Sequence, residues 1–240
     1  MSIKKNFFYS SILSISNYIF PFLTFPYVSR VLGVENLGKV NFVDGIINYF
    51  LLFASLGIGT IGIREIAKNK DNEKISSSVF SNLLFFNFIL TFVVCIVYIF
   101  CIYYLYKLEN YQELLFIGLA KILFTLFLIE WFFAGIENFK FITVRSISIK
   151  FLYMILVFIL VNDSDDYKIY FFLTVMITVL SGILNLYYCT NFVKFSLKNV
   201  SIKKYVKPVF VMGFYSLLTY MYTSYNVIYL GFISGDREVG

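Results

Sequence analysis

Long uncharged apolar runs follow one another along almost the whole of this 240-residue chain, and they restrict its fold more than any other feature. A run of about 20 apolar residues is the length that crosses a bilayer as an α-helix. Hydrophobic residues make up 60% of the sequence and charged residues only 14%, whereas a soluble domain has roughly 45–50% apolar residues. The sequence therefore predicts a membrane protein.

Seven such runs are candidates for membrane-spanning segments. They cover residues 7–29, 42–61, 79–102, 114–134, 146–162, 169–192 and 209–233. Strands of a membrane barrel would alternate polar and apolar residues over about 10 positions, but these runs are longer and continuous in Phe, Leu and Ile. The predicted fold class is all-α, a polytopic transmembrane helix bundle.

Lysine and arginine residues in the loops predict the orientation, because basic residues stay preferentially on the cytoplasmic side. The side of the N-terminus is expected to carry Lys4, Lys5, Arg64, Lys68, Lys70, Lys74, Lys140, Arg145, Lys150, Lys194, Lys198, Lys203, Lys204 and Lys207. The opposite side carries only Arg30, Lys39, Lys107, Lys168 and Arg237. We therefore expect a multi-pass protein with a cytoplasmic N-terminus. Topology and anionic lipid account for the net charge of +6, so no nucleic-acid partner is expected.

The sequence offers little material for metal or cofactor chemistry. It contains no histidine, and Cys95, Cys101 and Cys189 all fall within predicted membrane helices. Zinc sites need clustered cysteine and histidine ligands. We expect no metal site and no cofactor, and the sequence leaves open whether a coupling ion is used.

Polar residues gather on one face of each of the first two predicted helices. At about 100° per residue, one arc of roughly 80° contains Ser10, Ser14, Asn17, Pro21 and Thr24. In the second helix an arc of roughly 100° contains Asn41, Asp44, Gly45, Asn48, Ser55, Gly59 and Gly62. Such faces are used either for helix packing or for lining a wet cavity. Pro21 and Pro26 are also expected to kink the first helix.

The candidate ionisable residues inside predicted spans are Asp44, Lys121 and Glu130. A charge within the bilayer is costly, so each requires a partner, a wet cavity or a function. Lys121 and Glu130 are nine residues apart and would face opposite sides of an unbroken helix. We therefore predict that they do not pair with each other.

A glycine-bracketed stretch, GVENLG at 33–38, has a counterpart in GDREVG at 235–240. Each follows a predicted outward-running helix, and six spans separate them, so both have the same orientation. This pattern favours two parallel repeats related by an axis along the membrane normal. The predicted domains are an N-terminal six-helix bundle over residues 1–200 and the start of a second bundle over 201–240, where the chain stops.

Three segments resemble the bacterial polysaccharide flippases. They are FPYVSRVLGVENLGKV with LGIGTIGIREIAK, then EWFFAGIENFKFITVR, and finally VKPVFVMGFYSLLTYMYTSYNVIYLGFISGDREVG. The motif residues of this resemblance are Gly33, Glu35, Gly38, Glu65, Trp131, Gly135 and Glu137. Members of this family usually have twelve or more helices, so the resemblance implies the N-terminal half of such a transporter.

The resemblance implies that the protein flips polyprenyl-diphosphate-linked oligosaccharide repeat units, for O-antigen, lipopolysaccharide or capsule, across the bacterial plasma (inner) membrane by alternating access. This activity makes no covalent bond, so the protein is not expected to be an enzyme. The expected partners are the lipid-linked substrate, the bilayer and other polysaccharide-assembly membrane proteins. A diphosphate cannot enter hydrocarbon without groups that replace its water. The candidate substrate-binding residues are Arg30, Arg64, Lys121, Asp44, Asn48 and Asn17.

Two other functions and one simpler role stay open from the sequence. A drug or metabolite antiporter of the same architecture would bind cations and would use acids such as Asp44. A membrane polysaccharide polymerase or glycosyltransferase would need catalytic acids, for which the outer loop offers Asp163, Asp165 and Asp166, although acidic loop tips are usually solvated surface. Arg30 and Arg64 are equally suited to helix C-termini or lipid headgroups.

Overall fold

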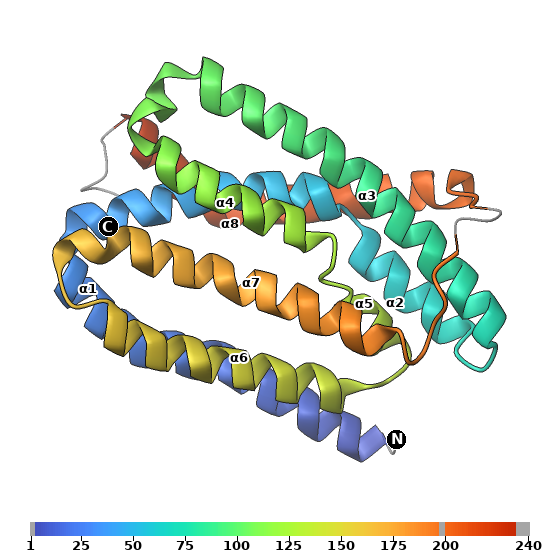
Figure 1. The fold of residues 1–240 in the computed structure, drawn as a ribbon. Helices are drawn as coiled ribbons and strands as arrows, with labels where there is room; N and C mark the ends of the chain where they lie inside the picture. Colours follow the sequence, from blue (N-terminus) through green and yellow to red (C-terminus); the bar gives the residue numbers. More distant parts are fainter. Residues whose placement is uncertain (1–2, 197–199, 234–240) are drawn as a thin grey trace.

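The computed structural model describes residues 3–196 and 200–233, and its long helices lie side by side (Figure 1). In chain order the α-helices are α1 (Ile3–Ser55), α2 (Ile58–Lys68), α3 (Glu73–Tyr104), α4 (Gln112–Thr125), α5 (Glu130–Gly135), α6 (Phe139–Leu160), α7 (Tyr167–Cys189) and α8 (Lys203–Ile233). Two short 3-10 helices, η1 (Tyr106–Tyr111) and η2 (Ser164–Asp166), lie between them. The described part of the chain contains no strand, so the predicted all-α class is confirmed.

The first two predicted spans form one long helix, α1, that turns back on itself at Gly33 (Figure 1). Gly33 has φ 72° and ψ 170°, a conformation that glycine adopts readily because it has no Cβ. Helical backbone resumes directly afterwards, so residues 34–40 are not the loop that the sequence predicts. Pro21 and Pro26 lie inside α1, where only Gly33 departs from helical dihedrals. The counterpart at 235–240 lies outside the described residues.

Five described helical segments are long and apolar enough to cross a membrane. They are Lys4–Lys68, Glu73–Tyr104, Tyr106–Gly135, Phe139–Leu160 and Ser164–Cys189. The first of these contains both halves of α1 together with α2. Large apolar side chains, including Phe22 and Phe92, are exposed on the bundle surface, where lipid would cover them. The chain is therefore a multi-pass membrane helix bundle.

The buried side chains form three clusters between the helices. One cluster joins the second half of α1 to α3, α4 and α7 around Ile47 and Tyr98. A second joins α2, α3, α5 and α8 around Phe132, and a third joins the first half of α1 to α6 and α7 around Val157. In lipid, close packing of this kind is what holds helices together.

Helix α8 packs against α1 and α2 at the point where α1 ends. A Cβ atom added to Gly57 would lie 2.4 Å from the Met212 Cβ and 2.6 Å from the Val209 carbonyl oxygen. A Cβ atom added to Gly213 would lie 2.6 Å from a methyl carbon of Leu56. Glycine at both positions therefore permits a close crossing. The division into domains at residues 1–200 and 201–240 stays a prediction.

Candidate functional site

The fourth predicted span is interrupted at residues 126–129, between α4 and α5. An interruption leaves backbone carbonyl groups without helical partners, and inside a bilayer they need other donors. The Asn185 side-chain amide donates to the Phe127 carbonyl at 3.1 Å, and the Asn87 amide donates to the Leu126 carbonyl at 3.5 Å. Asparagines from α7 and α3 thus stabilise the break.

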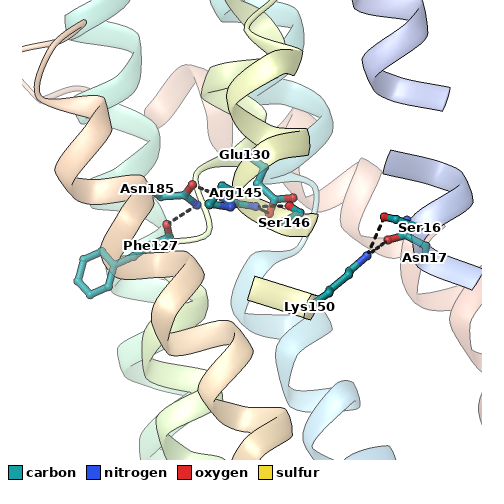
Figure 2. Close-up of polar contacts among 8 residues, drawn as sticks. All are labelled: Ser16, Asn17, Phe127, Glu130, Arg145, Ser146, Lys150 and Asn185. Carbon is teal, nitrogen blue, oxygen red and sulfur yellow. Dashed lines mark hydrogen bonds and ion pairs between the residues drawn. The ribbon is translucent and has the colours of Figure 1, made fainter. Parts of the chain in front are cut away.

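Arg145 on α6 connects this break to its neighbours, as Figure 2 shows. Its guanidinium group donates to the Glu130 carboxylate at 2.5 Å, to the Ser146 hydroxyl at 2.9 Å and to the Asn185 side-chain oxygen. Arg145 is only 5% exposed and Asn185 is fully buried. Glu130, predicted to need a partner other than Lys121, pairs with Arg145. The network that links α5, α6 and α7 is buried at Arg145 and Asn185 and half-exposed at Glu130.

Lys150 follows Arg145 on α6, and its amine points toward the first half of α1 (Figure 2). It donates to the Ser16 hydroxyl at 3.4 Å and to the Asn17 side-chain oxygen. Within the described residues, no carboxylate lies within the 4.0 Å that defines an ion pair with Lys150. Its hydrogen-bond partners are neutral, and Glu130, the acid whose charge acts on Lys150 through space, is itself paired with Arg145.

Arg145 and Lys150 were expected on the cytoplasmic side, and neither was included among the substrate-binding candidates. The predicted start of the fifth span at residue 146 is wrong, because α6 begins at Phe139, so Arg145 lies inside the helix as Lys150 does. Asn138 caps the helix by accepting a hydrogen bond from the Phe141 N–H, which starts the helix before both basic residues. The signal that could have found them is this asparagine, a residue type that favours the N-cap.

Asp44, Asn48 and Lys121 form a second polar cluster between the second half of α1 and α4. The Lys121 amine lies 2.5 Å from one Asp44 carboxylate oxygen, and the Asn48 amide donates to the other at 2.9 Å. The side chains of Lys121 and Asp44 are 15% and 33% exposed. The structure thus brings together three of the six predicted binding residues. Lys121 pairs with Asp44 and not with Glu130, which confirms the prediction that Lys121 and Glu130 do not pair with each other.

The remaining predicted binding residues lie apart from this cluster. Asn17 contacts Lys150. Arg30 is exposed on α1, without an ion pair or hydrogen bond within the described chain. Arg64 is exposed on α2 and donates to the neighbouring Glu65 carboxylate at 3.1 Å. No contact among the described residues joins Arg30 or Arg64 to Lys121.

Several motif residues pack α2 against α5. A Cβ atom added to Gly62 would lie 2.4 Å from a ring carbon of Trp131. A Cβ atom added to Gly135 would lie 2.7 Å from the Ile66 Cβ. Trp131 is itself 6% exposed and packs beside Phe80. Two sequence blocks of the flippase resemblance therefore meet at this helix contact.

The other motif residues lie just after the reversal at Gly33 and just after the end of α5. Glu35 pairs with Lys39 one turn along α1 at 3.0 Å, while Gly38 is buried. Glu137 has φ 60°, and its carboxylate lies 2.8 Å from the Lys70 amine. The hydrogen bond and charge of Lys70 hold the pKa of Glu137 below its usual value, and Glu137 raises the pKa of Lys70 in return.

The acidic outer loop supports its own backbone. The Asp166 carboxylate accepts hydrogen bonds from the N–H groups of Asn162 and Asp163, and Asp163 accepts one from the Ser164 N–H. These contacts form the capping box of η2. Within the described residues, no group of three His, Cys, Asp or Glu side chains is placed to hold a metal ion. Asp163 and Asp166, two of the three acids considered for a membrane enzyme, therefore have local structural roles in this loop.

Comparison with known proteins identifies the family of this chain. Residues 3–240 match the family described as "Polysaccharide biosynthesis protein". Two relatives named "Putative O-antigen transporter", from Escherichia coli (strain K12) and Shigella dysenteriae, are 27% and 28% identical over 243 residues, which cover 100% and 98% of this chain. The chain spans 59% and 60% of the length of these relatives. No solved structure matches the chain. Because the family match covers almost the whole sequence, this chain belongs to the polysaccharide biosynthesis protein family.

Proposed function

We propose that this chain forms part of a transporter that flips polyprenyl-diphosphate-linked oligosaccharide repeat units across the bacterial plasma membrane. The family and the names of the relatives support polysaccharide-related export. The observation that carries the finer proposal is Lys150, a cation on a membrane-spanning helix whose described partners are the neutral oxygens of Ser16 and Asn17. The nearby Glu130 is already paired with Arg145, so an anionic substrate group would give Lys150 a counter-charge of its own.

The balance of charges in the membrane helices favours an anionic cargo over a cationic one. Asp44 is neutralised by Lys121, and Glu130 is neutralised by Arg145. Lys150 then leaves an excess of positive charge among these residues. A diphosphate loses its water on entering a low-dielectric site, and fixed cationic donors offset that loss. A cation antiporter would instead need an acid without a basic partner in this position.

The orientation of the chain is part of the same proposal. Many lysines, including Lys70, Lys140 and Lys203, lie at the end of the bundle where α1 and α8 begin and α7 ends (Figure 1). Basic residues near the ends of membrane helices stay preferentially in the cytoplasm. The N-terminus would accordingly be cytoplasmic, and substrate would be loaded from that side.

The experiment compares Lys150→Gln and Lys150→Arg in the full-length protein, reconstituted into vesicles with a fluorescent lipid-linked oligosaccharide. Loss of a hydrogen bond to a charged group costs about 1.5–3 kcal/mol. Translocation by Lys150→Gln at low substrate concentration should therefore fall by about tenfold or more, while Lys150→Arg keeps most of the rate. Lys203→Gln, which removes an exposed cation, is the matched control and should transport normally.

A normal rate for Lys150→Gln would refute the role of Lys150 in substrate binding. Equal transport of a lipid-linked glycan without phosphate would refute the anionic cargo itself. Far-ultraviolet circular dichroism and thermal unfolding of each variant show whether a lost rate reflects lost structure, because Lys150 also holds α6 to α1 through Asn17.

A further inference from the structure

A pocket of about 430 Å³ opens between the first turns of α6 and the last turns of α7. Its polar wall includes Lys140, Arg145 and Ser148, and its apolar wall includes Val144, Leu184 and Tyr187. The pocket does not include Lys150, Asp44 or Lys121. It is therefore separate from the residues assigned above to the transported substrate, although Arg145 borders both regions.

The apolar wall faces the surroundings of the bundle. Val144, Leu184 and Tyr187 are 53%, 41% and 77% exposed. In a membrane protein, apolar side chains this exposed on a spanning helix are covered by lipid chains. Tyr187 also has the amphipathic ring that is enriched where a helix meets the headgroup layer. The pocket thus opens toward lipid at a helix end.

The polar wall carries positive charge that is not fully paired within the described residues. Lys140 is exposed and has no carboxylate or hydrogen-bond partner within the described residues. Arg145 forms part of the wall although it is 5% exposed, and its Nε–H has no acceptor. A buried donor without a partner costs about 1–3 kcal/mol. The Nε atom itself is out of reach of solvent, so Arg145 adds positive charge to the wall and Lys140 supplies the exposed N–H donors.

The backbone at the start of α6 adds to this attraction. Asn138 accepts from the Phe141 N–H at 3.4 Å, and the N-terminal end of a helix carries partial positive charge. The wall is also held in place, since the Phe141 and Tyr188 rings stack with centroids 4.0 Å apart. The Arg145 guanidinium lies over the Phe141 ring at 5.8 Å. These contacts hold Arg145 in position before any ligand arrives.

We propose that this pocket binds the phosphate headgroup of an anionic phospholipid, with the Lys140 amine as its main donor and the Arg145 guanidinium as a fixed positive charge in the wall. The acyl chains then lie along Val144, Leu184 and Tyr187. Basic pockets between membrane helices on the cytoplasmic side are suited to such headgroups. The site anchors the α6–α7 pair to the leaflet while Lys150, on the same helix, remains available to the cargo.

The test is native mass spectrometry of the full-length protein, titrated with phosphatidylglycerol or phosphatidylcholine in detergent. Wild-type protein should retain one phosphatidylglycerol more tightly than phosphatidylcholine. Lys140→Gln should weaken that binding by about fivefold, the effect of one basic residue at an anionic surface. Ser148→Trp should weaken it by filling the pocket without removing charge. Lys203→Gln, at the same end of the bundle, should leave it unchanged.

Equal weakening by Lys140→Gln and Lys203→Gln would overturn the proposal, because it would show a general surface charge effect. Unchanged binding in both Lys140→Gln and Ser148→Trp would overturn it as well. A polyprenyl diphosphate that displaces the bound phosphatidylglycerol at equal concentration, in wild type but not in Lys140→Gln, would reassign the pocket to the cargo lipid. Arg145 is left intact in every variant, because its network supports the fold.

Discussion

Replacing Gly62 with alanine tests the contact between α2 and α5 directly. The new Cβ would lie 2.4, 2.6 and 3.0 Å from three ring carbons of Trp131, whereas ordinary contacts begin near 3.4 Å. The shortest of these distances falls short by about 1 Å. Trp131 is buried and packed beside Phe80 and Phe132, so its ring cannot swing aside. The two helices must separate locally.

Gly59, three residues earlier on α2, is the matched control, because a Cβ there meets nothing within 4 Å. Both substitutions gain the same helix propensity, about 1 kcal/mol for glycine to alanine. The difference between them therefore isolates the cost of overpacking, about 1–3 kcal/mol. At roughly 2–4 °C per kcal/mol for a chain of this size, Gly62→Ala should unfold several degrees below Gly59→Ala.

The assay is thermal unfolding of the purified protein in detergent, followed by circular dichroism and by fluorescence. Trp131 is the one tryptophan in the sequence, so a change in its emission in Gly62→Ala would locate the disturbance. A second substitution, Trp131→Leu, should cost less in the Gly62→Ala background than in the wild type, since it removes the clashing ring. Equal unfolding temperatures for Gly62→Ala and Gly59→Ala would refute the close packing of α2 on α5.

Two further predictions concern ion pairs. Asp44→Asn or Lys121→Gln alone should each lower the free energy of unfolding by about 3 kcal/mol, the low end for a broken buried pair, because both groups are partly exposed. The double variant should lose less than the sum, which chemical denaturation of the four proteins would measure. At the exposed pair, the pKa of Glu137 is lowered from 4.5 and that of Lys70 is raised from 10.5. The stabilisation by this ion pair should therefore be present between pH 4.5 and pH 10.5. It should be lost as the pH drops through the lowered pKa of Glu137, and also as the pH rises through the raised pKa of Lys70. Lys70→Gln should flatten both limbs of a plot of unfolding temperature against pH.

The sequence predicts which parts of the chain become membrane helices, because apolar runs of spanning length are visible without any tertiary information. It predicts their ends less well. Residues 34–40 read as a polar loop, yet the reversal needs only Gly33 and the helix continues. The break at 126–129 has the wholly apolar sequence LFLI, directly before Glu130, and hydropathy gives no sign of it. That break is stabilised by Asn185 and Asn87 from other helices, and such contacts appear only in the folded chain.

The same limit explains which site residues were predicted. Asp44, Asn48 and Lys121 were found because a charge inside an apolar run is conspicuous, and the structure joins them. Lys150 was missed because it was counted with the basic residues that predict the orientation, although the predicted span 146–162 already contained it. Lys121 and Glu130 were predicted not to pair because they would face opposite sides of a continuous helix, whereas the helix is interrupted between α4 and α5. That prediction is nevertheless confirmed, since Glu130 pairs with Arg145.

The residues that carry the family resemblance and the residue proposed to bind cargo have different roles. Trp131, Gly135 and Glu137 pack or tether α5 against α2 and its following loop, and each of these short helices joins a membrane helix through a non-helical break. Such a pair can keep its internal packing while the breaks absorb a change of angle. Lys150 lies outside these blocks, on α6, where a change of cargo charge would act on it first. Under the proposed function, exchanging side chains around Lys150 would therefore change cargo recognition and leave the α2–α5 contact intact.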